Sequence, residues 1–262
     1  MDENEIIDTA HAVADAARGA ILPHFRKAGL EAENKRVGGF DPVTQADRAA
    51  EEAMRQVLRI RRPQDAVLGE EFGHAAGQSG LTWVLDPIDG TRAFLSGTPT
   101  WGVLIAVSGE AGPLYGIIDQ PYITERFEGG FGRARMRGPH GEENLATRGA
   151  RPLSEAILFT TFPEIGDAAE RAAFEAVSAE VRLTRYGMDC YAYALLAAGQ
   201  IDLVIEAGLQ PYDIQAPLAV IEAAGGIVTD WQGGPAHEGG RVLAAANRVQ
   251  HQAALELLNK GA

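Results

Sequence analysis

Two helices are predicted at the start of the chain from the spacing of its apolar residues. From Ile6 to Ile21, apolar side chains recur three or four positions apart, which indicates an amphipathic helix that ends before Pro23. A second run with the same spacing extends from about Thr44 to Ile60. Each helix should therefore bury one face against the rest of the molecule.

Short apolar runs replace the helical spacing from residue 65 onward and predict a middle rich in β-strands. Turns that contain glycine separate these runs, as they do between successive strands of a sheet. The expected strands cover residues 66–68, 81–85, 101–107 and 114–118, followed by successive strands over about 127–136.

Strands and helices alternate after residue 150, which predicts a layered α/β arrangement. The expected strands are 157–161, 201–206, 227–230 and 242–246, and the expected helices are 167–179, 190–198, 214–224 and a last one from about 250. We therefore expect an N-terminal α+β lobe over 1–148 and a C-terminal α/β lobe over 149–262, joined into one functional unit.

Composition and charge narrow the range of functions. The 262 residues are 46% apolar and 23% charged, which is ordinary for a globular protein. The net charge of −13 argues against general nucleic-acid binding, which needs a basic face. No stretch has the length and apolar character needed to cross a membrane. A single cysteine, Cys190, rules out an intrachain disulfide, and the acidic N-terminus is unlike a secretory signal, so we expect a cytoplasmic protein.

The segment Trp-Val-Leu-Asp-Pro-Ile-Asp-Gly-Thr carries the clearest chemical signal. A buried strand runs into two acids, Asp86 and Asp89, while Pro87 forces an extended backbone between them. Gly90 permits a turn or a close approach to a ligand, and a short helix from Thr91 would direct its free N–H groups toward an anion. Carboxylates beside an anion site suit magnesium, which binds a few carboxylates together with phosphate oxygens. The alternative is an Asp-Pro turn followed by a helix cap.

Three other acids occupy positions from which they could join this site. Glu70 follows an apolar strand, although a solvated acidic loop would look the same. Asp47 lies three residues after Thr44, so it is either a catalytic acid or one half of a capping box, or both. Asp213 precedes a predicted helix and is either a metal ligand or an N-cap.

Motifs of other hydrolases are missing from the sequence. It has no His-Glu-x-x-His, no cysteine pairs, no P-loop and no Gly-x-Ser-x-Gly. The two acids are three positions apart, whereas the phosphatases that form an aspartyl-phosphate begin with Asp-x-Asp.

Taken together, the motifs resemble the inositol monophosphatase family. Its pattern is an upstream Asp, a Glu-Glu pair, the Asp-Pro-Ile/Leu-Asp-Gly-Thr segment, and a Trp-Asp before a helix and Gly-Gly. The matching positions are Asp47, Glu70-Glu71, residues 86–91, and Tyr212-Asp213 ahead of Gly225-Gly226, with Tyr212 where Trp is usual. The resemblance implies a layered αβαβα fold, a homodimer, and Mg²⁺-dependent hydrolysis of phosphomonoesters.

The resemblance also implies the ligands of the metal ions. Glu70, Asp86 and the carbonyl of Ile88 would bind one Mg²⁺. Asp86, Asp89 and Asp213 would bind a second. Most of these ligands fall in the predicted N-terminal lobe.

Further roles follow from the same resemblance. Gly90 and Thr91 would hold phosphate through their backbone N–H groups. Asp47 would polarise the Thr91 hydroxyl, which orients the attacking water. Residues 29–40, which are rich in glycine, are a candidate for a flap over the site.

The substrate is predicted from a closer resemblance to the bacterial histidinol-phosphate phosphatases of this family, carried by the segments around Asp189 and Glu206. These two acids could pair with the amine and imidazole of histidinol phosphate. Alternatively, Asp189 caps the following helix and Glu206 binds the hydroxyls of an inositol. Arg92 is expected to contact the substrate, and related nucleotide-bisphosphate phosphatases also have a basic residue there.

We therefore predict a histidinol-phosphatase of histidine biosynthesis. An inositol-1-phosphate or broad sugar phosphatase is the alternative. A regulatory binding protein on the same fold is a third possibility, because some family members act in transcription complexes.

Overall fold

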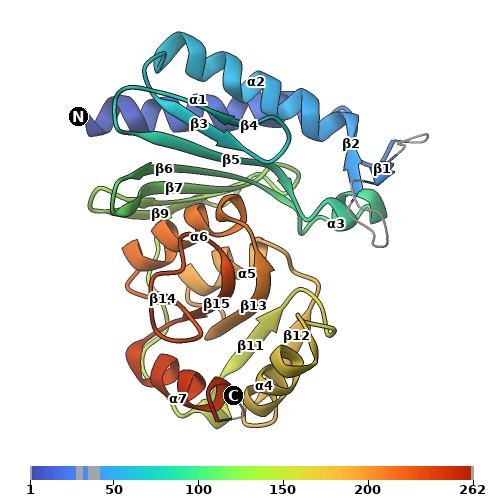
Figure 1. Ribbon diagram of the computed structural model, residues 1–262, viewed down its shortest axis with the longest axis vertical. Helices are drawn as coiled ribbons and strands as arrows, with labels where there is room; N and C mark the ends of the chain where they lie inside the picture. Colours follow the sequence, from blue (N-terminus) through green and yellow to red (C-terminus); the bar gives the residue numbers. More distant parts are fainter. Residues whose placement is uncertain (1, 28–31, 35–41, 261–262) are drawn as a thin grey trace.

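The computed structural model shows five stacked layers, of helices, sheet, helices, sheet and helices (Figure 1). It describes residues 2–27, 32–34 and 42–260. The layers confirm the predicted αβαβα fold, with two mixed sheets flanked by helices. Most of the candidate flap at 29–40 lies outside the described residues. Within the described ranges, no helix has the length and apolar character to cross a membrane.

The outer layer at the N-terminal end consists of α1 (Glu3–Ile21) and α2 (Gln45–Arg61). The Asp2 carboxylate caps α1 by accepting hydrogen bonds from two backbone N–H groups. At the start of α2, Thr44 and Asp47 form a capping box. The apolar faces of both helices pack on the first sheet, as their spacing predicts. A two-stranded ribbon, β1 (Ala32–Asn34) with β2 (Pro42–Thr44), lies ahead of α2.

The first sheet has eight strands in the order β10-β9-β8-β7-β6-β5-β3-β4. Among the described residues, β3 and β5 are the only neighbouring strands of this sheet that run parallel. All other neighbouring strands are antiparallel. The strands are β3 (Ala66–Gly69), β4 (Gly73–Ala75), β5 (Thr82–Asp89), β6 (Gly102–Gly109), β7 (Gly112–Gln120), β8 (Glu125–Gly130), β9 (Arg133–Gly138) and β10 (Gly141–Asn144). The short helix α3 (Thr91–Ser96) follows β5.

The second sheet has five strands in the order β12-β11-β13-β15-β14. These are β11 (Ile157–Thr160), β12 (Leu183–Tyr186), β13 (Leu203–Leu209), β14 (Ile227–Asp230) and β15 (Gly240–Ala245). Between the two sheets lie α5 (Tyr191–Ala197) and α6 (Pro211–Ala223), and the outer face is covered by α4 (Ala168–Ser178) and α7 (Arg248–Leu258) (Figure 1). A 3-10 turn, η1 (Leu153–Glu155), precedes β11.

The central helix α6 joins the two halves of the molecule. It comes from the C-terminal half, yet it packs on β6, β7 and β8 of the first sheet. Gly116 and Gly129 allow this close approach, because a Cβ at either position would lie within 2.5 Å of the α6 backbone. The division into lobes at residues 148 and 149 therefore stays a prediction.

Candidate active site

Parallel pairing of β3 and β5 brings Glu70 beside Asp86. Gly69 lies opposite Leu85 in this register, and the Glu70 N–H donates to the Leu85 carbonyl at 3.2 Å. The next residue on each strand is therefore an acid at the same edge of the sheet. The side chain of Glu70 forms a hydrogen bond with Asp86. Glu70 therefore contacts the acidic cluster and does not lie in a solvated loop, which was the alternative interpretation of its sequence.

A bulge in β5 turns Asp86 and Asp89 to the same side. In a regular strand, residues three positions apart face opposite sides of the sheet. Here Asp86 lies opposite Leu104 and Asp89 opposite Gly102, so β5 advances three positions while β6 advances two. The extra residue reverses the alternation. This bulge is the local reason why an Asp-x-x-Asp segment can present both carboxylates to one ligand.

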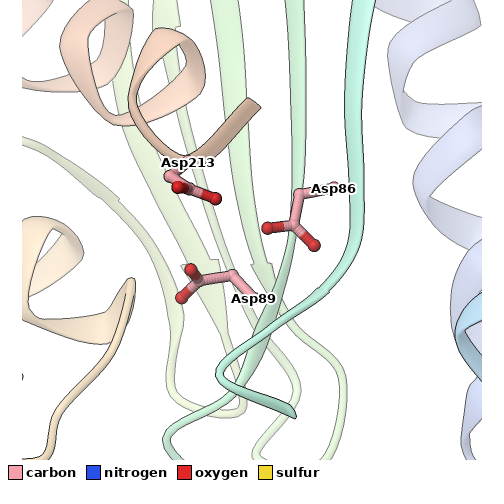
Figure 2. Close-up of side chains that lie close together, drawn as sticks. All are labelled: Asp86, Asp89 and Asp213. Carbon is pink, nitrogen blue, oxygen red and sulfur yellow. The ribbon is translucent and has the colours of Figure 1, made fainter. Parts of the chain in front are cut away.

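The third acid comes from the start of α6, far away in the sequence. Oxygen atoms of Asp86, Asp89 and Asp213 all lie within 4.8 Å of one another, and the side chains face one shared space (Figure 2). Asp213 is not the N-cap of α6. The helix begins at Pro211 after the cap Gln210, and Asp213 in its first turn accepts the Gln210 N–H at 2.7 Å. Asp213 therefore both stabilises the start of α6 and belongs to the acidic cluster.

The electrostatics of the cluster favour a cation. Burial raises the pKa of Asp86 well above its usual range, and the carboxylates of Glu70 and Asp89 raise it further. Burial also raises the pKa of Asp89, with Asp189 as the next cause. The donors gathered here are carboxylate oxygens, which suit Mg²⁺ better than a softer metal. The cluster is thus consistent with the metal dependence of the family that the sequence motifs resemble.

The loop after β5 turns at Gly90 and leads directly into α3. Gly90 has a left-handed backbone, with φ at 84°, and a Cβ there would lie 2.7 Å from Cγ of Asp189. Only glycine fits this position without strain. The Thr91 hydroxyl donates to the Ile88 carbonyl at 3.2 Å.

Asp47 is held by its own helix cap. Its Oδ2 accepts the Thr44 hydroxyl at 2.6 Å and the Thr44 N–H at 2.9 Å. Burial raises the pKa of Asp47 to about 6, against the lowering effect of these hydrogen bonds. No hydrogen bond joins Asp47 to Thr91 within the described part of the chain, so its predicted catalytic role is not visible as a direct contact.

Asp189 and Arg92 line a cavity of roughly 280 Å³ that continues from Asp89 and Asp213. The predicted alternative for Asp189, an N-cap, is wrong: Cys190 occupies the N-cap position of α5, and the Asp189 carboxylate accepts the Thr100 hydroxyl at 2.7 Å. Burial raises the pKa of Asp189, while Thr100 and the Arg92 charge act in the opposite direction. The guanidinium carbon of Arg92 lies 4.6 Å from the centre of the Phe162 ring.

Glu206, on strand β13, also lines this cavity. One carboxylate oxygen accepts the Thr161 N–H at 2.6 Å and its hydroxyl at 2.9 Å, and the other accepts the Thr160 hydroxyl at 3.1 Å. Burial raises the pKa of Glu206 to about 7, although the threonine donors lower it. Glu206 is therefore a buried acid of the cavity that two threonines hold in place.

Comparison with known proteins decides the family. The model of the inositol monophosphatase family matches residues 2–261. The chain belongs to the inositol monophosphatase family. Members of this family are metal-dependent phosphomonoesterases, and the acidic cluster gives this chain the matching site.

Two curated relatives and one solved structure place it more closely within the inositol monophosphatase family. The chloroplastic bifunctional phosphatase IMPL2 of Arabidopsis thaliana is 42% identical over 260 residues, or 95% of this chain and 73% of that protein. The histidinol-phosphatase of Streptomyces coelicolor is 33% identical over 261 residues, or 96% of both chains. An inositol monophosphatase structure from Zymomonas mobilis superimposes with a TM-score of 0.87 at 39% identity, and covers 98% of this chain and 99% of its own.

In this member of the family, Glu51 is a site residue that the sequence prediction missed. It is fully buried on α2, pairs with Arg55 at 2.7 Å, and accepts the Glu71 N–H at 2.7 Å and the Phe72 N–H at 3.2 Å. Glu51 thus fixes the turn that carries Glu70. Its position four residues after Asp47, on a face otherwise lined with alanine and other apolar residues, was the available signal.

Proposed function

We propose that this chain is a Mg²⁺-dependent histidinol-phosphatase that converts L-histidinol phosphate to L-histidinol and phosphate in histidine biosynthesis. The observation that carries the proposal is the pair of acids, Asp189 and Glu206, that share one cavity with Asp89 and Asp213 of the acidic cluster. Two further acids in this cavity suit an alcohol that bears an amine and an imidazole. The match to a bacterial histidinol-phosphatase over nearly its whole length supports this choice.

Under this proposal, the acidic cluster holds the metal. Glu70, Asp86 and the Ile88 carbonyl would bind one Mg²⁺, and Asp86, Asp89 and Asp213 would bind a second. When bound, Mg²⁺ neutralises the phosphate charge and lowers the pKa of water to make it a nucleophile. The chain itself orients the phosphate.

The loop residues hold the phosphate in place. The backbone N–H groups of Gly90 and Thr91 receive its oxygens. For Asp47 to act on the Thr91 hydroxyl, that hydroxyl has to turn away from the Ile88 carbonyl to which it donates. Asp47 then orients the attacking water through Thr91.

Inositol-1-phosphate or a sugar phosphate is the second candidate substrate. It is favoured by Glu206, which is fixed by Thr160 and Thr161 and can accept hydrogen bonds from sugar hydroxyls as readily as from an ammonium group. The solved structure of the Zymomonas mobilis inositol monophosphatase supports this candidate. A homodimer, a cytoplasmic location and a regulatory binding role remain predictions.

Phosphate release from four esters tests the proposal. The panel contains histidinol phosphate, inositol 1-phosphate, a sugar phosphate and adenosine 3′,5′-bisphosphate, each with Mg²⁺ and with EDTA. We expect the highest kcat/KM with histidinol phosphate. Preference for another ester would reject the proposed substrate while it left the phosphatase chemistry in place. A stable protein complex without turnover of any ester would favour the regulatory role.

A further inference from the structure

Tyr193, a residue of the cavity lining, has a buried hydroxyl without a hydrogen-bond partner in the described part of the chain. Tyr193 on α5 is 4% exposed, and its Oη forms no hydrogen bond with any described residue. Other buried atoms in the same condition belong to Trp101, Gln120, Arg151 and Arg171, and none of these side chains lines the cavity. Tyr193 does line it.

The acids around this hydroxyl already have donors. Glu206 accepts three hydrogen bonds from Thr160 and Thr161, and Asp89 accepts the Cys190 N–H at 2.6 Å. The Tyr193 hydroxyl donates to neither carboxylate, and a buried polar group without a partner is costly. A ligand that occupies the cavity can supply the missing partner.

The environment keeps the phenol protonated. Burial raises the pKa of Tyr193 well above its usual range, and the charges of Glu206, Asp89 and Asp213 raise it further. The hydroxyl can thus donate a hydrogen bond at neutral pH. Tyr193 lines the cavity together with Glu206, the acid that we propose to contact the organic part of a bound ester.

We infer that Tyr193 is a substrate-binding residue whose hydroxyl donates a hydrogen bond to an accepting atom on the alcohol half of the phosphate ester. This atom is a neutral imidazole nitrogen in histidinol phosphate or a hydroxyl oxygen in a sugar ester. The inference rests on the proposed phosphatase function but does not depend on which polar ester is preferred.

The test compares Tyr193→Phe with wild type on the preferred ester and on phenyl phosphate, whose alcohol half has no such acceptor. We expect KM for the polar ester to rise about tenfold, which is about 1.4 kcal/mol, while kcat stays within about twofold. KM for phenyl phosphate should not change. The melting temperature without substrate should stay the same or rise, by up to about 2–4 °C, because an unsatisfied buried hydroxyl has been removed.

Tyr191→Phe is the matched control. Tyr191 lies on the same helix but outside the cavity lining, and its hydroxyl donates to Glu125 at 2.8 Å. This variant should melt at a lower temperature and keep the KM of wild type. An unchanged KM in Tyr193→Phe, an equal KM rise for both esters, or a melting temperature that falls as in the control would each overturn the inference. If wild type hydrolyses no ester at all, the proposed function fails and the inference falls with it.

Discussion

Replacement of Asp89 by Asn should have opposite effects on the stability of the metal-free and the metal-bound protein. Oxygen atoms of Asp86, Asp89 and Asp213 lie within 4.8 Å of one another. Two full charges at this distance repel by about 3.5 kcal/mol at an effective dielectric constant of about 20. Because Asp89 is half-buried and holds its proton to higher pH than usual, the relief on neutralising it is smaller, about 1–2 kcal/mol.

The effect of Mg²⁺ follows from mass action. A cation at about 100 times its Kd stabilises the folded protein by about 2.7 kcal/mol. For a chain of this size, that corresponds to a rise of about 5–10 °C in melting temperature. Asp89→Asn retains an oxygen that can accept the Cys190 N–H but removes the ligand charge, so Mg²⁺ should no longer raise its melting temperature.

Thermal unfolding with EDTA and with Mg²⁺ is the assay. With EDTA, Asp89→Asn should melt about 2–8 °C above wild type, and with saturating Mg²⁺ the order should reverse. Asp8→Asn is the control, since it makes the same chemical change at an exposed residue of α1. The reasoning is refuted if Mg²⁺ stabilises Asp89→Asn as much as wild type, or if the variant melts lower in EDTA.

Three further substitutions test the surroundings of the cluster. Asp189→Asn, which can still accept the Thr100 hydroxyl, should raise KM for histidinol phosphate several-fold more than KM for phenyl phosphate in steady-state assays; equal changes would reject its contact with the substrate amine. Glu206 has its pKa raised from 4.5 to about 7, so the folded state binds the extra proton, and the stability of wild type relative to Glu206→Gln should fall by about 3 kcal/mol as pH rises from about 4.5 to 7. Urea unfolding across that range measures the fall, and a stability difference that rises with pH would contradict the assignment. Glu51→Gln should lower the free energy of unfolding by about 3–5 kcal/mol, because it leaves buried Arg55 without its charge partner. It should also lower kcat through the displaced Glu70, whereas Glu52→Gln, on the exposed face of the same helix, should change neither in urea unfolding and turnover assays; normal activity in Glu51→Gln would show that it does not position Glu70.

Periodicity in the sequence was sufficient for elements that bury one face. The apolar spacing from Ile6 to Ile21 predicted α1, and the buried run before Asp86 predicted β5. The strand β12 was missed because it lies at a sheet edge with mostly exposed side chains, so no alternation appears. The start of α6 was predicted three residues late, since its cap is a glutamine followed by proline.

Some features of the site can likewise be predicted from the local sequence, whereas others depend on the tertiary structure. The motif around Asp86 and the acids Glu70 and Asp213 carried local signals, and the structure brings them together. The bulge in β5 and the orphaned hydroxyl of Tyr193 depend on register and on neighbours distant in sequence. Local patterns cannot report whether a buried polar atom has a partner.

We propose that this carboxylate cluster binds Mg²⁺ and thereby supports hydrolysis of histidinol phosphate. The most direct measurement is phosphate release from histidinol phosphate by protein stripped with EDTA and then titrated with Mg²⁺, for wild type and Asp89→Asn in parallel. We predict no release after stripping, full recovery of wild type on titration, and no recovery of the variant. Release that persists in EDTA, or a variant that recovers with wild type, would show that hydrolysis does not depend on Mg²⁺ bound at Asp89.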